Sequence, residues 1–278
     1  KYFMNSDNLT NPILKWAGGK RQLLPEIVKI LPPKFNKLIE PFVGGGALFF
    51  YLNKKNSIIS DTNIELINLY KQIAINPHKI LKMIKNYKNT KNDFYKVRKN
   101  IPNNLVERAC RTIFLNKTCF NGLYRVNKKG EFNVPYGNNK NIKFIDENNL
   151  LNSSKLLKKT NILELSYEIV LNKYSKSNDL IFLDPPYLPI SKYSDFKRYT
   201  KEQFYFDDHR KLAQLYSELD KKGCYLILTN SNNPEILKLY KKFNIKTFET
   251  RRSINSKGKL RTGKDIIVTN YETNTRTV

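Results

Sequence analysis

The stretch LIEPFVGGG at residues 38–46 decides how this chain is expected to fold. It begins with a short, mostly apolar run at residues 38–42, typical of a buried strand, and its glycines lead into a helix expected from about Ala47. A second apolar run at residues 57–60 ends at Asp61. The helix expected after it carries an apolar stripe at helical spacing: Leu66, Leu69, Tyr70, Ile73 and Ala74. Strand, turn, helix and strand in this order form a βαβ unit, which indicates a parallel sheet.

The same pattern returns in the last third of the chain. Residues 179–183 predict an apolar strand that stops at Asp184, and residues 224–229 and 264–271 predict two further strands. Between the first two of these strands, an apolar stripe predicts a helix: Leu212, Leu215, Tyr216 and Leu219. The acidic residues Asp207 and Asp208 favour its start. The chain is therefore predicted to have an α/β core.

The middle of the chain has a different character. Residues 76–160 are rich in Lys, Asn and aromatic residues, with one clear amphipathic helix at residues 106–114. That helix leads into residues 119–137, which are punctuated by Gly, Asn and Pro and predict a hairpin. We interpret this region as an insertion, so that the core occupies residues 1–75 and 160–278 and the insert occupies residues 76–159.

The charge of the chain is strongly basic. Its 278 residues include 50 Lys and Arg against 24 Asp and Glu, a formal net charge of +26. Such a charge favours a polyanionic partner, and nucleic acid is the first candidate. Lys and Asn are abundant throughout, as in NYKNTKN at residues 86–92, so a biased overall composition is an equally open explanation. The charge ranks classes of partner without proving one.

The residues that commonly bind metals are few and scattered. Cys110, Cys119 and Cys224 lack metal-ligand spacing and are expected to be reduced, buried thiols of a cytoplasmic protein. His78 and His209 are far apart in the sequence, which argues against a zinc site. No apolar run approaches the roughly 18 residues of a membrane span. We therefore expect neither a metal nor a membrane.

The glycine loop and the acid after the second strand have a known use in α/β proteins. Glycines at residues 44–46 allow positive φ and let a ligand approach the backbone closely. A carboxylate such as Asp61, at the end of the next strand, can bind the two ribose hydroxyls of an adenosine-containing cofactor. An ordinary tight turn is the alternative for the glycines alone.

The sequence DPPY at residues 184–187 directly follows a predicted strand, where α/β sheets place their ligands. Asp-Pro and Pro-Pro also occur in ordinary turns. However, this order suits the N6 amino group of adenine, which is a poor nucleophile. The Asp184 carboxylate and a backbone carbonyl fixed by proline could each accept one amino N–H and aim the nitrogen lone pair. Tyr187 offers a stacking face for a base rotated out of a duplex.

A third motif, KWAGGK at residues 15–20, contains the single Trp of the chain. In this order the three motifs resemble the Dam-type (alpha-group) DNA adenine-N6 methyltransferases, and the resemblance runs from Trp16 to about Tyr271. Its most specific part is FNGLYRVN at residues 120–127 with GEFNVPYG at residues 130–137, which resembles the recognition hairpin of members that modify GATC sites.

The resemblance implies a fold, a reaction and partners. The expected fold is a seven-stranded, Rossmann-like core that uses S-adenosylmethionine, with an inserted, mainly helical DNA-recognition subdomain containing a β-hairpin. The expected reaction is methyl transfer to N6 of a flipped adenine in double-stranded DNA, within a GATC-like site. We also expect a monomer that is located at the nucleoid in the cytoplasm. A cognate restriction endonuclease would be a partner by function only.

The resemblance also implies roles for individual residues. The cofactor-binding positions are Trp16, Lys20, Glu40, Phe42, Gly44, Asp61 and Asp184. The catalytic positions are Asp184, Pro185, Pro186 and Tyr187. The DNA-binding positions are Lys15, Phe120, Asn121, Leu123, Arg125 and Pro135. Arg251 and Arg252 begin a basic loop that would contact phosphates, with a solvated hairpin tip as the alternative. Ser166 and Tyr167 correspond to a segment that packs on the cofactor adenine, although the acid usual there is absent.

Three other classes of protein stay open. A methyltransferase acting on cytosine N4, an RNA base or a glutamine amide commonly has Ser or Asn where this chain has Asp184. A nucleotide-binding dehydrogenase is disfavoured by the glycine spacing, which is not Gly-x-Gly-x-x-Gly. A non-catalytic DNA-binding protein is disfavoured because each motif residue is intact.

Overall fold

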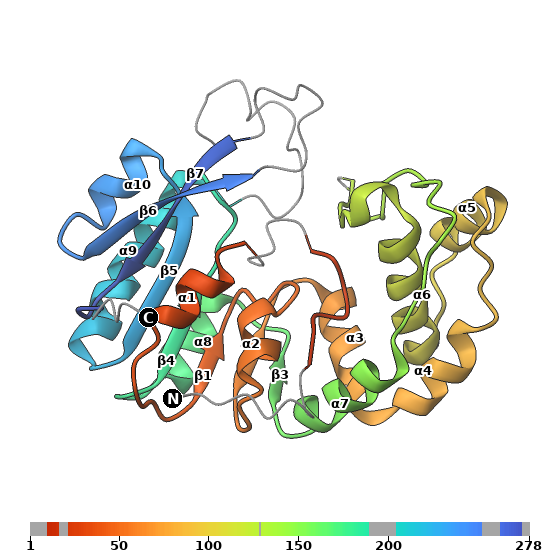
Figure 1. Cartoon of the computed structure of the whole chain (residues 1–278), viewed down its shortest axis with the longest axis horizontal. Coiled ribbons are helices and arrows are strands. Elements are labelled where there is room, and N and C mark those ends of the chain that lie inside the picture. The colour runs from red at the N-terminus through yellow and green to blue at the C-terminus, as the bar shows by residue number, and fades with distance from the viewer. Residues whose placement is uncertain (1–9, 17–21, 128, 189–203, 252–261, 274–278) are drawn as a thin grey trace. The chain divides into compact units, whose positions relative to one another are not determined.

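The computed structural model describes residues 10–16, 22–127, 129–188, 204–251 and 262–273 (Figure 1). These residues form a mixed α/β fold with a seven-stranded sheet in the order β3-β2-β1-β4-β5-β7-β6. The strands are β1 (Leu38–Glu40), β2 (Ile58–Ser60), β3 (Asn161–Leu163), β4 (Leu180–Leu183), β5 (Tyr225–Ser231), β6 (Asn244–Arg251) and β7 (Thr262–Thr269). The predicted α/β class and the strands expected from the apolar runs are confirmed, whereas β3 and β6 were not predicted individually.

The helices of the described part of the chain are α1 (Leu24–Lys29), α2 (Ala47–Leu52), α3 (Ile64–Ile75), α4 (Pro77–Ile84), α5 (Lys91–Lys99), α6 (Leu105–Thr118), the 3-10 turn η2 (Phe120–Gly122), α7 (Glu147–Leu157), α8 (Tyr167–Tyr174), α9 (Phe206–Lys221) and α10 (Pro234–Leu239). The chain divides into two compact units. The first comprises Lys1–Gly19 and Val43–Ser166, and the second comprises Lys20–Phe42 and Tyr167–Val278. The insertion bounds 76–159 stay a prediction.

In the first unit, α3 is the central helix. It begins after Asn63, whose side chain accepts a hydrogen bond from the backbone N–H of Leu66 at 3.1 Å and so caps the helix. The predicted stripe is buried, and Ile67 is buried as well, because α6 and α7 both pack on α3. β2 and β3 pair in parallel, with Ile59 opposite Ile162.

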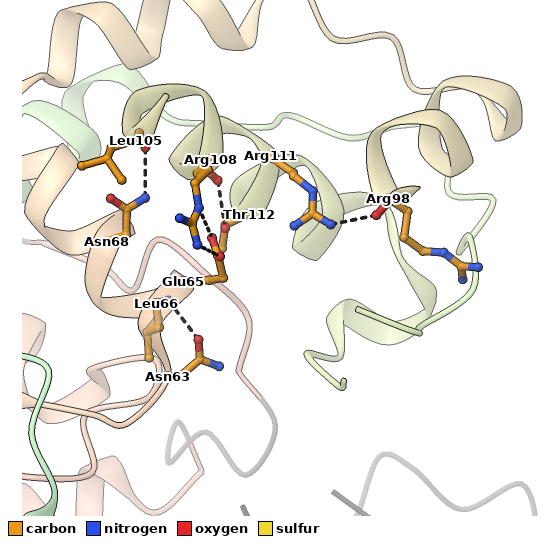
Figure 2. A network of polar contacts seen from close by, with 9 residues as sticks. All are labelled: Asn63, Glu65, Leu66, Asn68, Arg98, Leu105, Arg108, Arg111 and Thr112. Carbon is orange, nitrogen blue, oxygen red and sulfur yellow. Dashed lines mark hydrogen bonds and ion pairs between the residues drawn. The ribbon is translucent and has the colours of Figure 1, made fainter. Parts of the chain in front are cut away.

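A polar network joins α3 to α6 in this unit (Figure 2). Glu65 forms an ion pair with Arg108, and the Asn68 amide donates to the Leu105 carbonyl at 2.9 Å. Arg111 is buried, and its guanidinium donates to the Val97 and Arg98 carbonyls at 3.0 and 2.8 Å, in the last turn of α5. A cation at a helix C-terminus satisfies carbonyls that lack a partner within the helix. The network therefore fixes α6 against both α3 and α5.

The predicted hairpin at residues 119–137 is present, although it is held by isolated antiparallel bridges rather than a continuous ladder. Cys119 pairs with Tyr136, and Val126 pairs with Phe132. The Asn127 N–H donates to the Glu131 carbonyl at 2.8 Å and closes the turn at the tip. The region between α3 and β3 also contains the helices α4, α5, α6 and α7. It is therefore mainly helical, as expected.

In the second unit, β1, β4 and β5 are parallel neighbours, with Leu183 opposite Leu228 between β4 and β5. β7 is antiparallel to both β5 and β6, and the long β6–β7 pair is visible in Figure 1. Every residue of β4 is buried, which is usual for a strand in the middle of a parallel sheet. Asp184 follows β4 at its carboxyl end.

All three cysteines are buried and form no disulfide, as predicted. Burial raises the pKa of Cys110 to about 12 and that of Cys224 to about 11, so both are protonated at neutral pH. Burial likewise raises the pKa of Cys119 to about 11. Within the described residues, no helix combines the length and the apolar character that crossing a membrane requires.

Candidate active site

In the first unit, the glycine loop and Asp61 form one hydrogen-bonded assembly. Gly44 has a φ of 46° and donates its N–H to Asp61 Oδ2 at 3.1 Å. The other oxygen, Asp61 Oδ1, accepts from the Asn63 N–H at 2.9 Å. The Tyr70 hydroxyl donates to the Gly44 carbonyl at 2.6 Å. The Asp61 carboxylate therefore joins the loop before α2 to the residue that caps α3.

Trp16 packs directly on this loop. A Cβ added at Gly44 would lie 2.8 Å from Trp16 Cδ1, and one at Gly45 would lie 3.1 Å from Trp16 Cβ. Such distances leave no room for a side chain, and the positive φ of Gly44 disfavours one further. Trp16 is half-buried, so its ring is neither enclosed in the apolar core nor fully exposed. The structure thus brings together Trp16, Gly44 and Asp61, three of the predicted cofactor-binding residues.

In the second unit, the predicted residues Glu40 and Phe42 lie at the end of β1. Glu40 is buried, and Phe42 is half-buried. The Phe42 ring stacks on Tyr167 with ring centres 5.1 Å apart, and Phe204 meets the Phe42 ring edge-on at 5.8 Å. This aromatic cluster presents flat apolar faces next to the carboxyl end of β1. Lys20, another predicted cofactor residue, lies outside the described residues.

Asp184 and the residues after it are held by the neighbouring strand β5. The Thr229 hydroxyl donates to Asp184 Oδ1 at 2.7 Å, and the Ser231 hydroxyl donates to the Leu188 carbonyl at 2.7 Å. Pro185 is buried, whereas Pro186 is exposed and Tyr187 is half-buried. The segment that contains DPPY is thus anchored at both ends by β5.

His209 adds a buried titratable group near these residues. Its side chain is 0% exposed, Phe204 meets it edge-on with ring centres 4.7 Å apart, and its Nδ1 lies 3.5 Å from the Asn230 amide nitrogen. Burial lowers the pKa of His209 to about 4, only partly opposed by Asp208. His209 is therefore neutral at pH 7.

Sequence reasoning did not identify Thr229, Asn230 or His209. One signal was available for the first two, because TNSN at residues 229–232 follows an apolar run in the same way that Asp184 does. No comparable signal marks His209, which lies within the first turn of a helix. Within the described residues, no group of three His, Cys, Asp or Glu side chains could hold a metal ion.

The predicted base-reading residues lie on the hairpin and beside it. Phe120 is 52% exposed, and its N–H donates to the Pro135 carbonyl at 2.9 Å. Arg125 is exposed, and its Nε donates to Asn133 Oδ1 at 2.8 Å across the hairpin. Asn121 has a positive φ of 55° and is exposed, and Leu123 is half-buried. Lys15 is exposed and packs against Gly122, where an added Cβ would lie 2.8 Å from Lys15 Cδ. Arg251 ends β6, and Arg252 lies outside the described residues.

Comparison with known proteins agrees with this geometry. Residues 16–254 match the family described as D12 class N6 adenine-specific DNA methyltransferase. The Type II methyltransferase M.MjaIII of Methanocaldococcus jannaschii is 44% identical, over 94% of this chain and 99% of the relative. The Type II methyltransferase M1.LlaDCHI of Lactococcus lactis subsp. cremoris is 41% identical, over 96% and 97%. A DNA adenine methylase of Haemophilus influenzae is 33% identical, over 87% of each chain.

The match decides among the classes that the sequence left open. It supports adenine N6 in DNA over cytosine N4, RNA or a protein amide, and it supports a methyltransferase over a dehydrogenase or a non-catalytic DNA-binding protein. The methyl donor is S-adenosylmethionine, and the substrate is DNA. This chain belongs to the D12 class of N6 adenine-specific DNA methyltransferases.

Proposed function

We propose that this enzyme methylates the adenine of GATC sites in duplex DNA after the base has rotated out of the helix. The observation that carries the proposal is the exposed guanidinium of Arg125, oriented across the hairpin by Asn133 at 2.8 Å. A guanidinium fork pairs bidentately with O6 and N7 of guanine in the major groove. Lys15, Leu123 and Pro135 would contact the other bases, and residues 76–159 would form the target-recognition insert.

Two aromatic side chains would stabilise the flipped state. Phe120 is exposed at the start of η2 and would stack in the space that the adenine leaves, with Asn121 beside it. Tyr187 would stack on the adenine after it has left the duplex. Arg251 and Arg252 would contact phosphates, where basic side chains position a protein without reading sequence.

The residues present fit S-adenosylmethionine, which supplies an electrophilic methyl group on a positively charged sulfur. In the first unit, Gly44 has no side chain, so the half-buried ring of Trp16 packs directly on the backbone of the glycine loop. The Asp61 carboxylate supplies acceptors of the kind that bind ribose hydroxyls. We assign Lys20, Glu40, Phe42 and Asp184 to the same cofactor on the family resemblance, and these residues complete the proposed set.

The chemistry that this chain supplies at the adenine is orientation and proton acceptance. The Asp184 carboxylate and the Pro185 carbonyl would each accept one N–H of the amino group, and the prolines keep that carbonyl rigid. A carboxyl with an ordinary pKa of about 3.9 is too weak a base to deprotonate the neutral amino group. Asp184 therefore receives a proton only from a nitrogen that has become cationic.

The names of two relatives bear on the biological role. Both M.MjaIII and M1.LlaDCHI are Type II methyltransferases. We propose that this chain also acts in restriction-modification, with a cognate endonuclease that cleaves the same unmethylated site, and that it acts as a monomer at the nucleoid.

Methyl transfer from labelled S-adenosylmethionine to three duplexes tests the proposal. The duplexes contain GATC, a scrambled site, or GATC already methylated at adenine N6. Label recovered as N6-methyladenine in the unblocked GATC duplex alone supports the site and the reaction together. Label in the scrambled duplex as well would overturn the site, and label found only in unrelated sequences would do the same.

A further inference from the structure

Asn116 on α6 has a side chain whose polar atoms are all used. It is 1% exposed. Its Oδ1 accepts the N–H of Lys15 at 3.1 Å, and its Nδ2 donates to the Lys15 carbonyl at 2.7 Å and to the Gly122 carbonyl at 3.2 Å. One amide thus holds both backbone groups of Lys15 and ties them to the first residues of the hairpin.

Two side-chain contacts reinforce the same connection. Gly122 packs so closely on Lys15 that a Cβ would lie 2.8 Å from Lys15 Cδ and 3.0 Å from Lys15 Cβ. The Trp16 ring stacks on Tyr124 of the hairpin, with ring centres 4.9 Å apart and planes 20° apart. We call Lys15, Trp16, Asn116, Gly122 and Tyr124 the hairpin junction.

The helix that carries Asn116 is itself firmly placed. Glu65 and Asn68 of α3 bind Arg108 and the Leu105 carbonyl near the start of α6 (Figure 2). α3 in turn is capped by Asn63, whose N–H donates to Asp61. Asn116 therefore projects from a helix fixed to the element that starts beside the proposed ribose-binding carboxylate.

Two adjacent residues of the hairpin junction would contact different substrates, one the DNA and the other the cofactor. Lys15 is proposed to contact a base, and Trp16 packs on the loop proposed to hold the cofactor. Because the Asn116 amide holds both backbone groups of Lys15 and the Gly122 carbonyl, a shift of one of these segments on binding one substrate also shifts the segment that the other substrate meets. By thermodynamic linkage, the factor by which DNA changes the affinity for the cofactor equals the factor by which the cofactor changes the affinity for DNA.

We infer that Asn116 is a positioning residue through which specific DNA and S-adenosylmethionine strengthen each other's binding. This inference rests on the proposed function, because it takes Trp16 as a cofactor residue and the hairpin as the base-reading element. In this role Asn116 and Tyr124 act through Lys15 and Trp16, and they need not touch the cofactor or a base themselves.

The coupling is measured with S-adenosylhomocysteine, which binds like the methyl donor but transfers nothing. The Kd of the enzyme for S-adenosylhomocysteine is measured under three conditions: without DNA, with a saturating scrambled duplex, and with a saturating duplex that accepts methyl groups in the labelling assay. The coupling factor is the ratio of the last two values. For the unaltered enzyme we expect a factor of about 5 or more.

Three variants separate positioning from general stability. Asn116→Asp keeps the shape but places carboxylate oxygens against the Lys15 and Gly122 carbonyls, and Tyr124→Leu removes the stack on Trp16. Both should bring the factor close to 1. Thr112→Val is the matched control, because Thr112 is a buried residue one turn before Asn116 whose hydroxyl donates at 3.0 Å to the Arg108 carbonyl of α6 itself. It should keep the full factor.

The outcomes are distinct. A factor of 1 in the unaltered enzyme, with both ligands bound, overturns the inference and leaves the proposed function standing, as does an unchanged factor in both junction variants. If Asn116→Asp does not fold, Tyr124→Leu decides. Unchanged affinity for S-adenosylhomocysteine in Trp16→Ala instead overturns the cofactor assignment, and the inference with it.

Discussion

The hydroxyl of Thr229 donates a hydrogen bond to Asp184, with 2.7 Å between Thr229 Oγ1 and Asp184 Oδ1. The two residues stand one position beyond the paired residues Leu183 and Leu228 of adjacent parallel strands. Thr229 is fully buried, and a β-branched side chain has few χ1 rotamers, so its hydroxyl is held in place. The orientation of the Asp184 carboxylate is therefore set by the neighbouring strand.

Replacing Thr229 by Val should slow methyl transfer without weakening substrate binding. A hydrogen bond to a charged group is worth about 1.5–3 kcal/mol, so kcat should fall about 10- to 100-fold. KM for DNA and for S-adenosylmethionine should stay within about threefold, since neither is expected to contact Thr229. Thr229→Ser keeps the hydroxyl and should retain most of the rate. Equal rates for the Val variant and the parent enzyme would show that Asp184 needs no such support.

Asp184→Ala should abolish methyl transfer while DNA binding largely survives. The variant removes the acceptor for the adenine amino group but leaves Arg125 and the hairpin untouched. Single-turnover transfer and duplex binding by fluorescence anisotropy measure the two properties separately. A variant that loses both equally would point to a structural role for Asp184.

Asp61→Ala should weaken cofactor binding more than it slows the reaction. It removes the acceptor of the Gly44 and Asn63 N–H groups together with the proposed ribose ligand, and KM for S-adenosylmethionine should rise at least about tenfold. Asp146→Ala is the matched control, because Asp146 caps α7 by accepting from the Asn149 N–H at 3.0 Å. The control should lose about 1 kcal/mol of stability without a change in KM.

Arg125→Ala should relax the choice of base at one position of the site. Each bidentate contact contributes about 1–3 kcal/mol of discrimination, so single-base variants of the duplex should gain relative to GATC at that position alone. Competition between duplexes in one reaction measures the preference. Lys129→Ala, at an exposed residue of the same hairpin, should leave the preference unchanged. A uniform loss on every sequence would make Arg125 a phosphate contact instead.

The elements that the sequence predicted share a strong physical signal. β1, β2 and β4 are buried apolar runs followed by glycine or an acid, and α3 has an uninterrupted apolar stripe. α5 was missed because Phe94 is its one buried residue and the rest is polar or half-exposed. β6 was missed because its two apolar residues, Ile245 and Phe248, are three positions apart, so the segment lacks the alternation that marks a half-buried strand.

The candidate site was predictable only where chemistry required an unusual residue. Asp61 and Asp184 stand out as acids that end apolar strands. Thr229 and Asn116 are ordinary neutral residues whose importance comes from a partner 45 or 101 positions away. Contacts over such separations are set by sheet order and helix packing, which periodicity in a single sequence does not specify.

The buried His209 should make the enzyme less stable in mild acid. Its pKa is lowered to about 4 in the folded protein, against about 6.5 in the unfolded chain, so the unfolded chain takes up the proton first as the pH falls. The contribution of neutral His209 to the free energy of unfolding is complete above pH 6.5 and is lost as the pH falls from 6.5 to 4. At pH 5 the loss amounts to about 2 kcal/mol. Urea unfolding at pH 7.5 and pH 5 should therefore show a smaller loss of stability for His209→Phe than for the parent. His78→Gln, on the exposed side of α4, is the matched control and should behave as the parent does. The same pH dependence in parent and His209→Phe would mean that His209 is protonated with the chain still folded.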